Sequence, residues 1–162
     1  MARPSRPPRR WRRTEMPTPA VLADLRRDEG LRLIAYPDPL SGGDPWTIGY
    51  GHTGPEVRKG LVWSLAQAEA ALAQDAGVVE GALDRNLPWW REMTPARQDV
   101  LVNMAFNLGV PGLLKFRATL SQMRAGDYAA AAAGMLASLW ARQVGPRARR
   151  LAEMMRVGVR TA

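Results

Sequence analysis

Residues 29–53 read EGLRLIAYPDPLSGGDPWTIGYGHT, and this stretch decides how the rest of the chain is interpreted. It holds two carboxylates, Glu29 and Asp38, followed by Thr47 in a segment punctuated by glycines. A pair of carboxylic acids with a hydroxyl close by supplies the groups needed to split an acetal by acid/base chemistry. The stretch therefore predicts short strands that carry a candidate hydrolytic site.

A helix is predicted over residues 19–28, with Glu29 at its end. Thr18 provides an N-cap, Pro19 suits the first turn and Gly30 provides the stop, while an apolar stripe is formed by Val21, Leu22 and Leu25. The Glu29 carboxyl would lie at the negative end of the helix dipole, which disfavours its ionised form and suits a proton donor. Taken alone, however, a Glu before a helix-ending Gly is typical of an ordinary solvated terminus.

Asp38 follows a short predicted strand at residues 31–35, and a second strand is indicated over residues 46–50. Because prolines flank Asp38 on both sides, a turn aspartate that hydrogen bonds its own backbone is the alternative interpretation. The glycines near Thr47 do not have the spacing of a phosphate-binding loop.

The segments EGLRLIAYPD and WTIGYGHT together resemble the phage-type lysozymes. The resemblance implies a mainly helical, two-lobed α+β fold with a small sheet lobe. It also implies that Glu29 is the general acid, that Asp38 assists the attacking water and that Thr47 completes the catalytic group.

Two further segments extend the resemblance through about residues 21–160. NMAFNLG at residues 103–109 is similar to the family's cleft helix, where Asn107 would orient a sugar acetamido group and Phe106 would stack beside it or pack in the core. GPRARRLAE at residues 145–153 is similar to the basic final segment, and Arg147 matches a family arginine near the acid. Trp46 is a further candidate sugar contact, whereas core packing is expected of Trp63, Trp89, Trp90 and Trp140.

One departure from the family concerns the spacing of the second carboxylate. Eight residues separate Asp38 from Thr47, more than the family has, because of an insertion around SGGD. The insertion supplies a rival carboxylate, Asp44. We favour Asp38 because its spacing from Glu29 is intact. The separation of the two carboxylates decides between inversion and retention, and the resemblance implies inversion.

His52 is the only histidine in the chain. Its pKa range invites a catalytic role, but a structural role is favoured here. In the family the corresponding histidine pairs with an aspartate of the following long helix, and Asp75 matches that partner. The pair would tie the small lobe to the helix.

Composition sets further limits on the 162-residue chain, of which 46% is hydrophobic. With no cysteine and one histidine, neither a disulfide nor a usual zinc site is expected, and the sequence predicts no cofactor and no metal. No run approaches 18 apolar residues and no secretion signal is evident, so we expect accumulation in the host cytoplasm before lysis.

The net charge of +8 is concentrated at the two ends of the chain. Residues 1–14 hold six Arg and no acidic residue, and residues 142–162 hold six Arg and one Glu. Residues 1–18, rich in Pro and Arg, predict a disordered basic tail that contacts anionic bacterial surfaces; a solvated extension without function is the alternative.

The lysozyme domain is predicted to span residues 19–162. It comprises a small lobe at about 29–63 and a linking helix at about 64–86, which starts with a Ser64/Gln67 capping box. The helical lobe consists of about 87–162 together with helix 19–28. Within the helical lobe, helices are expected from Pro95 to about Gly109 and near 115–124, 127–138 and 146–158.

The resemblance implies a monomeric phage endolysin that cleaves the β-1,4 bond between N-acetylmuramic acid and N-acetylglucosamine in peptidoglycan, with no specific nucleic acid partner. Two alternatives stay open. A lytic transglycosylase would use Glu29 alone, and a noncatalytic cationic wall or nucleic-acid binder would depend on the Arg clusters.

Overall fold

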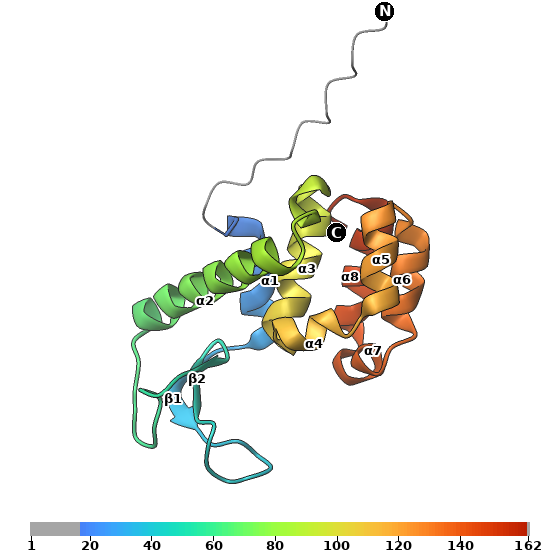
Figure 1. The fold of residues 1–162 in the computed structure, drawn as a ribbon. Coiled ribbons are helices and arrows are strands. Elements are labelled where there is room, and N and C mark those ends of the chain that lie inside the picture. The colour runs from blue at the N-terminus through green and yellow to red at the C-terminus, as the bar shows by residue number, and fades with distance from the viewer. Residues whose placement is uncertain (1–16, 162) are drawn as a thin grey trace, which may run out of the picture. The chain divides into compact units, whose positions relative to one another are not determined.

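A computed structural model describes residues 17–161, so most of the predicted tail lies outside the described residues (Figure 1). Contacts between residues divide the described chain into two compact units. The sheet unit contains residues 17–83 and 101–115, and the helical unit contains residues 84–100 and 116–161. Helices α2 and α3, with bounds Leu65–Asn86 and Pro95–Leu108, contribute residues to both units.

The sheet unit begins with helix α1, Pro19–Glu29, whose ends are set by local sequence. The Thr18 hydroxyl accepts a hydrogen bond from the Val21 amide at 3.2 Å, which satisfies one of the free donors of the first turn. Gly30 ends the helix at φ 70°, a conformation that costs glycine little. Glu29 is thus the last residue of α1, as predicted.

A three-stranded antiparallel sheet follows, with strand order β1–β2–β3. The strands are β1 Arg32–Tyr36, β2 Thr47–Gly49 and β3 His52–Thr53. Tyr36 pairs with Thr47, and Thr47 also pairs with Thr53, so β2 is the central strand (Figure 1). Residues 37–46 form the loop between β1 and β2.

Helix α2 starts with the predicted capping box. The Gln67 amide donates to the Ser64 hydroxyl at 3.1 Å, and the Ser64 amide donates to the Gln67 side-chain oxygen at 2.8 Å. The unit is completed by the second half of α3 and by α4, Val110–Leu114, which begins directly after Gly109.

Two apolar clusters form the core of the sheet unit. The first joins α1, the turn after β2 and α2 through Leu25, Tyr50, Ala68, Leu72 and Ala76. The second lies in the sheet region and contains Ala35, Ile48 and Val57. The first cluster explains why α1 groups with the sheet, whereas the sequence assigned helix 19–28 to the helical lobe.

The helical unit contains the 3-10 helix η1, Trp90–Glu92, and four α-helices. These are α5 Arg117–Ala125, α6 Tyr128–Leu136, α7 Leu139–Val144 and α8 Pro146–Val157. Helix α6 packs against α5, α7 and α8. The fully buried side chains of these helices include Met123 on α5, Met135 on α6, and Leu151 and Met155 on α8.

The segment predicted as one helix over 127–138 ends at Leu136, and a separate α7 follows. The Ser138 hydroxyl accepts from the Ala141 amide at 3.1 Å, so Ser138 caps a new helix rather than ending the old one.

Over residues 17–161 the helices include none with the length and apolar content that a membrane span requires. The fold is mainly helical with one small sheet, which confirms the predicted α+β class.

Candidate active site

The carboxyl of Glu29 lies beside the turn between β2 and β3. A Cβ atom placed on Gly51 would be 3.6 Å from Glu29 Oε2, which brings the end of α1 against the backbone of this turn. Gly51 has φ 82°, so a side chain there would be strained as well as close to the carboxyl. Glu29 is half-buried. The predicted acid is thus next to the β2–β3 turn.

A polar link fixes the last turn of α1 to α3. The Asn103 side-chain amide donates to Asp28 Oδ2 at 3.0 Å, and Asn103 is fully buried. The Asp28 side chain is only 5% exposed and also contacts Arg27. Because Asp28 directly precedes Glu29, this hydrogen bond restrains the backbone that carries the predicted acid.

Thr47 begins the central strand, and Trp46 directly precedes it. Thr47 is half-buried at the start of β2, where it pairs with both neighbouring strands. Trp46 packs against the cluster of Ala35, Ile48 and Val57. The ring of Trp46 therefore has a packing role in the sheet region.

Asp38 and Asp44 both lie in the loop between β1 and β2, but their environments differ. Asp38 Oδ2 accepts from the Ser41 amide at 3.2 Å, and the Asp38 amide and carbonyl bond the backbone of Gly43 and Gly42. Asp38 is half-buried, whereas Asp44 is exposed and precedes a cis peptide bond to Pro45. The inserted residues thus fold back onto Asp38, which makes the turn contacts that its flanking prolines indicate.

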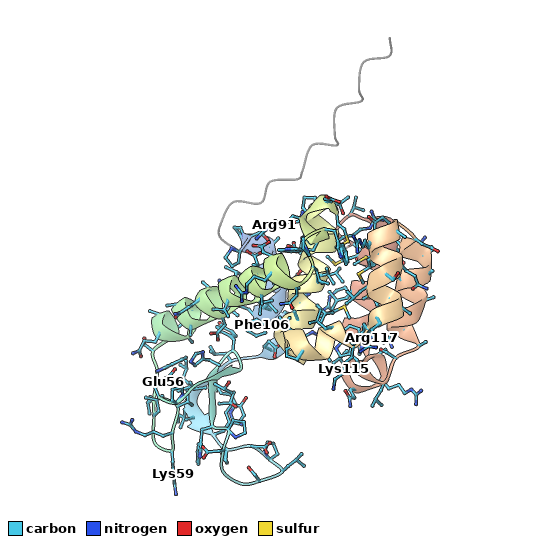
Figure 2. All side chains as sticks on the ribbon, in the orientation of Figure 1. Glu56, Lys59, Arg91, Phe106, Lys115 and Arg117 are labelled. Atoms are coloured by element: carbon cyan, nitrogen blue, oxygen red, sulfur yellow. The ribbon has the colours of Figure 1, made fainter. Side chains whose placement is uncertain are left out.

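Phe106 and Asn107 lie near the end of α3, where Figure 2 labels Phe106. The Phe106 ring is partly buried against the cluster that contains Leu25 and Tyr50, and Asn107 is exposed. Core packing, one of the two roles left open for Phe106, is therefore present. Arg147 belongs to the helical unit, where it is 8% exposed on α8.

His52 is held between two carboxylates. Its Nδ1 lies 2.7 Å from Asp75 Oδ2 on α2, and its Nε2 lies 2.6 Å from Glu56 Oε1 in the segment after β3, where Figure 2 labels Glu56. Its ring also contacts Trp63, with centroids 5.2 Å apart. His52 and Asp75 are in contact as the resemblance implied, and both ring nitrogens are occupied.

The electrostatics of this histidine favour the imidazolium. Burial, the largest single effect, disfavours the charged ring, but the hydrogen bonds to Glu56 and Asp75 outweigh it and raise the pKa of His52. The hydrogen bond from His52 in turn lowers the pKa of Glu56. Both ring nitrogens thus face carboxylates, which favours a structural bridge.

Sequence reasoning missed several polar partners in this unit. Tyr50 donates to Glu69 on α2, Glu69 also binds Arg26 on α1, and Asn103 binds Asp28. Glu56 lies four residues after His52, but no local pattern marks the other pairs, whose members are 19 to 75 residues apart. They emerge only when α1, α2 and α3 pack together.

Among the described residues, the predicted site residues belong neither to a group of possible metal ligands nor to one open surface depression. Within residues 17–161 there is no group of three or more His, Asp or Glu side chains that could hold a metal ion. An open depression of about 510 Å³ in the helical unit is lined by Asn86, Pro88, Trp89, Glu92 and Arg124, none of which was predicted as a site residue.

Comparison with known proteins identifies the family of this fold. The phage lysozyme family matches residues 26–155, a range that includes nearly all of both units. The chain is 34% identical over 169 residues to the pre-baseplate central spike protein Gp5 of Enterobacteria phage T4, a match that covers 88% of this chain and 28% of that protein.

Two endolysins are also similar. The endolysin of Acyrthosiphon pisum secondary endosymbiont phage 1 is 33% identical over 109 residues, which covers 67% of this chain and 70% of that protein. The endolysin of Bacillus phage B103 is 36% identical over 108 residues, which covers 67% of this chain and 40% of that protein. The chain thus spans well under half of the T4 spike protein and of the Bacillus phage endolysin. By the extent of the family match and by its fold, the chain belongs to the phage lysozyme family.

Proposed function

We propose that this protein is a peptidoglycan hydrolase that cleaves the β-1,4 bond between N-acetylmuramic acid and N-acetylglucosamine. The observation that carries the proposal is the position of the Glu29 carboxyl, at the end of α1 and against the Gly51 backbone, in a member of the phage lysozyme family. The names of the two endolysins give further support.

In the proposed reaction Glu29 protonates the glycosidic oxygen as the bond to the anomeric carbon breaks. Asp38 accepts a proton from the water that attacks the opposite face of the sugar, and the Thr47 hydroxyl orients that water through its donor and acceptor positions. The negative charge of Asp38 also stabilises the positive charge of the oxocarbenium-like transition state. The stereochemical outcome of this route is inversion.

Asp38 is preferred to Asp44 as the second carboxylate. It lies two residues after the end of β1, the strand that follows Glu29, and the inserted residues close back on it through the Gly42 and Gly43 bonds. The insertion therefore leaves the path from Glu29 to Asp38 unchanged. Phe106, Asn107, Trp46 and Arg147 are proposed to contact or orient the glycan.

A digest of purified peptidoglycan tests the activity. We expect new reducing ends without 1,6-anhydro ends, and the initial product should have the inverted anomeric configuration by proton NMR. Anhydro ends would identify a lytic transglycosylase instead. Wall binding without any new ends, weakened by salt, would identify a noncatalytic cationic binder.

The biological role we propose is that of an endolysin, which accumulates in the host cytoplasm and reaches the wall through a membrane pore. Cells that produce the protein should lyse only when a pore-forming protein is co-produced. The similarity to the T4 spike protein favours a second context, in which the domain acts within a phage particle. Detection of the chain in purified particles by mass spectrometry would support that context.

The basic N-terminal residues are proposed to bind anionic bacterial surfaces. Residues 1–14 hold six Arg and no acidic residue, which favours attraction to phosphate-rich polymers. We propose that the protein acts as a monomer. Removal of residues 1–16 should weaken its attack on intact Gram-negative cells more than its attack on isolated walls. Equal activity of both forms on intact cells would assign the tail no role there.

A further inference from the structure

Three side chains from three elements meet next to the turn that contacts Glu29. The Tyr50 hydroxyl donates to Glu69 Oε1 at 2.8 Å. The guanidinium of Arg26 binds Glu69 Oε2 through Nε at 2.8 Å and through Nη2 at 2.7 Å. We call these three residues the Tyr50 clamp. It joins α1, the β2–β3 turn and α2.

The clamp holds the two pieces of backbone between which the Glu29 carboxyl lies. Arg26 is on α1, about one helical turn before Glu29. Tyr50 directly precedes Gly51, whose Cβ position is 3.6 Å from Glu29 Oε2. Glu69 binds both, so a single carboxylate on α2 links the helix end to the turn.

Burial makes this spacing well defined. Tyr50 is only 7% exposed, and its ring packs with Leu25 and Leu72 in the first core cluster. The ring therefore places the hydroxyl, and a buried hydroxyl requires a partner. Glu69 supplies that partner from a side chain that is 32% exposed. Ring packing thus places the donor, and its hydrogen bond ties the β2–β3 turn to α2.

The charge states suit a clamp that persists across a wide pH range. Burial, followed by the hydrogen bond to Glu69, raises the pKa of Tyr50, so its hydroxyl keeps its proton. The hydrogen bond from Arg26, followed by that from Tyr50, lowers the pKa of Glu69, so it stays a carboxylate. Donor and acceptor roles are therefore fixed around neutral pH.

We propose that Tyr50, Glu69 and Arg26 are positioning residues for the acid at Glu29, because they fix the α1 end and the β2–β3 turn at the distance that the carboxyl requires. The inference rests on the proposed function of Glu29. It assigns the clamp a contribution to turnover beyond its contribution to the core, since small displacements of an acid from its working geometry slow a reaction strongly.

The test separates the Tyr50 hydroxyl from the Tyr50 ring. Tyr50→Phe keeps the packed ring and removes the donor, and Glu69→Gln keeps an oxygen for Tyr50 while removing the charge that binds Arg26. Tyr128→Phe is the matched control, because Tyr128 lies on α6 in the helical unit and its ring stacks on Arg97. All variants are made in the full chain and assayed on soluble, uncrosslinked peptidoglycan strands.

For Tyr50→Phe and Glu69→Gln we expect kcat per folded molecule to fall about tenfold while KM changes less than about twofold, and Tyr128→Phe should match the parent. Parental kcat in both clamp variants, or a rise in KM alone, would overturn the inference. If Tyr50→Phe does not fold, Glu69→Gln decides by the same criteria.

A second measurement does not depend on activity. Amide hydrogen exchange at residues 49–53 and the carboxyl carbon NMR signal of Glu29 should both change in Tyr50→Phe and in Glu69→Gln, but not in Tyr128→Phe. Unchanged exchange and an unchanged Glu29 signal would overturn the clamp even if activity fell. If the parent protein cleaves no glycan, the proposed function fails, and this measurement still decides whether the clamp fixes the turn.

Discussion

The sheet unit and the helical unit use polar side chains in different ways. In the sheet unit, side chains from separate elements bind one another beside Glu29, as in the Tyr50 clamp and in the bond from Asn103 to Asp28. In the helical unit, side-chain pairs such as Arg160 with Asp99 also occur, and two further side chains satisfy backbone carbonyls at a helix end. Arg97 donates to Met155 and Arg156 carbonyls at 2.7 Å and 3.0 Å, near the end of α8.

The difference follows from what each unit must hold in place. The last carbonyls of a helix have no partner within the helix, so Arg97 and the Thr94 hydroxyl, which donates to Gly158 at 2.7 Å, stabilise α8 itself. The side-chain pairs of the sheet unit link α1 to α2 and to α3, and α2 to the β2–β3 turn, so they surround Glu29. Substitutions in the sheet unit should therefore change activity more than stability, and those in the helical core should do the reverse.

The largest expected effect is on activity in the sheet unit. Glu29→Gln keeps the shape of the side chain and removes its proton, so glycan cleavage should fall by about a thousandfold or more. The free energy of unfolding, from urea denaturation, should stay within about 1 kcal/mol of the parent. Glu153→Gln, on α8, is the matched control and should keep parental activity. Near-normal cleavage by Glu29→Gln would refute its assignment as the acid.

The helical unit should show the opposite response. Met135 on α6 is fully buried, and Met135→Ala should lower the free energy of unfolding by about 2–5 kcal/mol through lost contacts and a cavity. Its kcat per folded molecule should equal that of the parent. The neighbouring Leu136 is 48% exposed, so Leu136→Ala should cost far less. Equal losses for the two variants would contradict the position of Met135 in the core.

Two substitutions in the β1–β2 loop decide which aspartate acts as the second carboxylate. Asp38→Asn keeps an oxygen for the Ser41 amide but removes the negative charge, and activity should fall about a hundredfold. Asp44→Asn, at an exposed position, should stay within about twofold of the parent. The initial rates of reducing-end formation give both values. A greater loss in Asp44→Asn would transfer the role of second carboxylate to Asp44.

The smallest effect concerns the bridge at His52. Because folding raises the pKa of His52, its stabilisation is fully present below the ordinary value of 6.5 and is lost as the pH rises through the raised value. Glu56 sets the acid limit, because folding lowers its pKa. Its contribution to stability is present above pH 4.5 and is lost as the pH falls through the lowered pKa. The bridge should therefore be strongest between about pH 5 and pH 6.

Thermal unfolding of the parent and of His52→Gln at pH 5.5 and pH 9 measures this dependence. The parent should exceed the variant in Tm by about 2–4 °C at pH 5.5, and the difference should shrink at pH 9. The Tm of His52→Gln should change less between the two pH values than that of the parent. A constant difference would show that the charge of the ring contributes nothing.

Much of the fold could be predicted because its signals are local. The Thr18 cap, the stop at Gly30 and the Ser64/Gln67 capping box all act within a few residues, and each is present in the structure. The resemblance to phage-type lysozymes and the α+β class are confirmed as well. The roles of Glu29, Asp38 and Thr47 stay predictions, since they concern a reaction rather than a conformation.

The sequence by itself determined the ends of α1 and α2 and which family motifs the chain carries, because capping, helical period and turn chemistry depend on neighbours along the chain. Only the tertiary structure decided that α1 packs with the sheet, that the inserted loop closes on Asp38 and that Tyr50 reaches Glu69. Those outcomes depend on which buried surfaces meet, and side chains far apart in the sequence acquire partners only when the elements that carry them pack together.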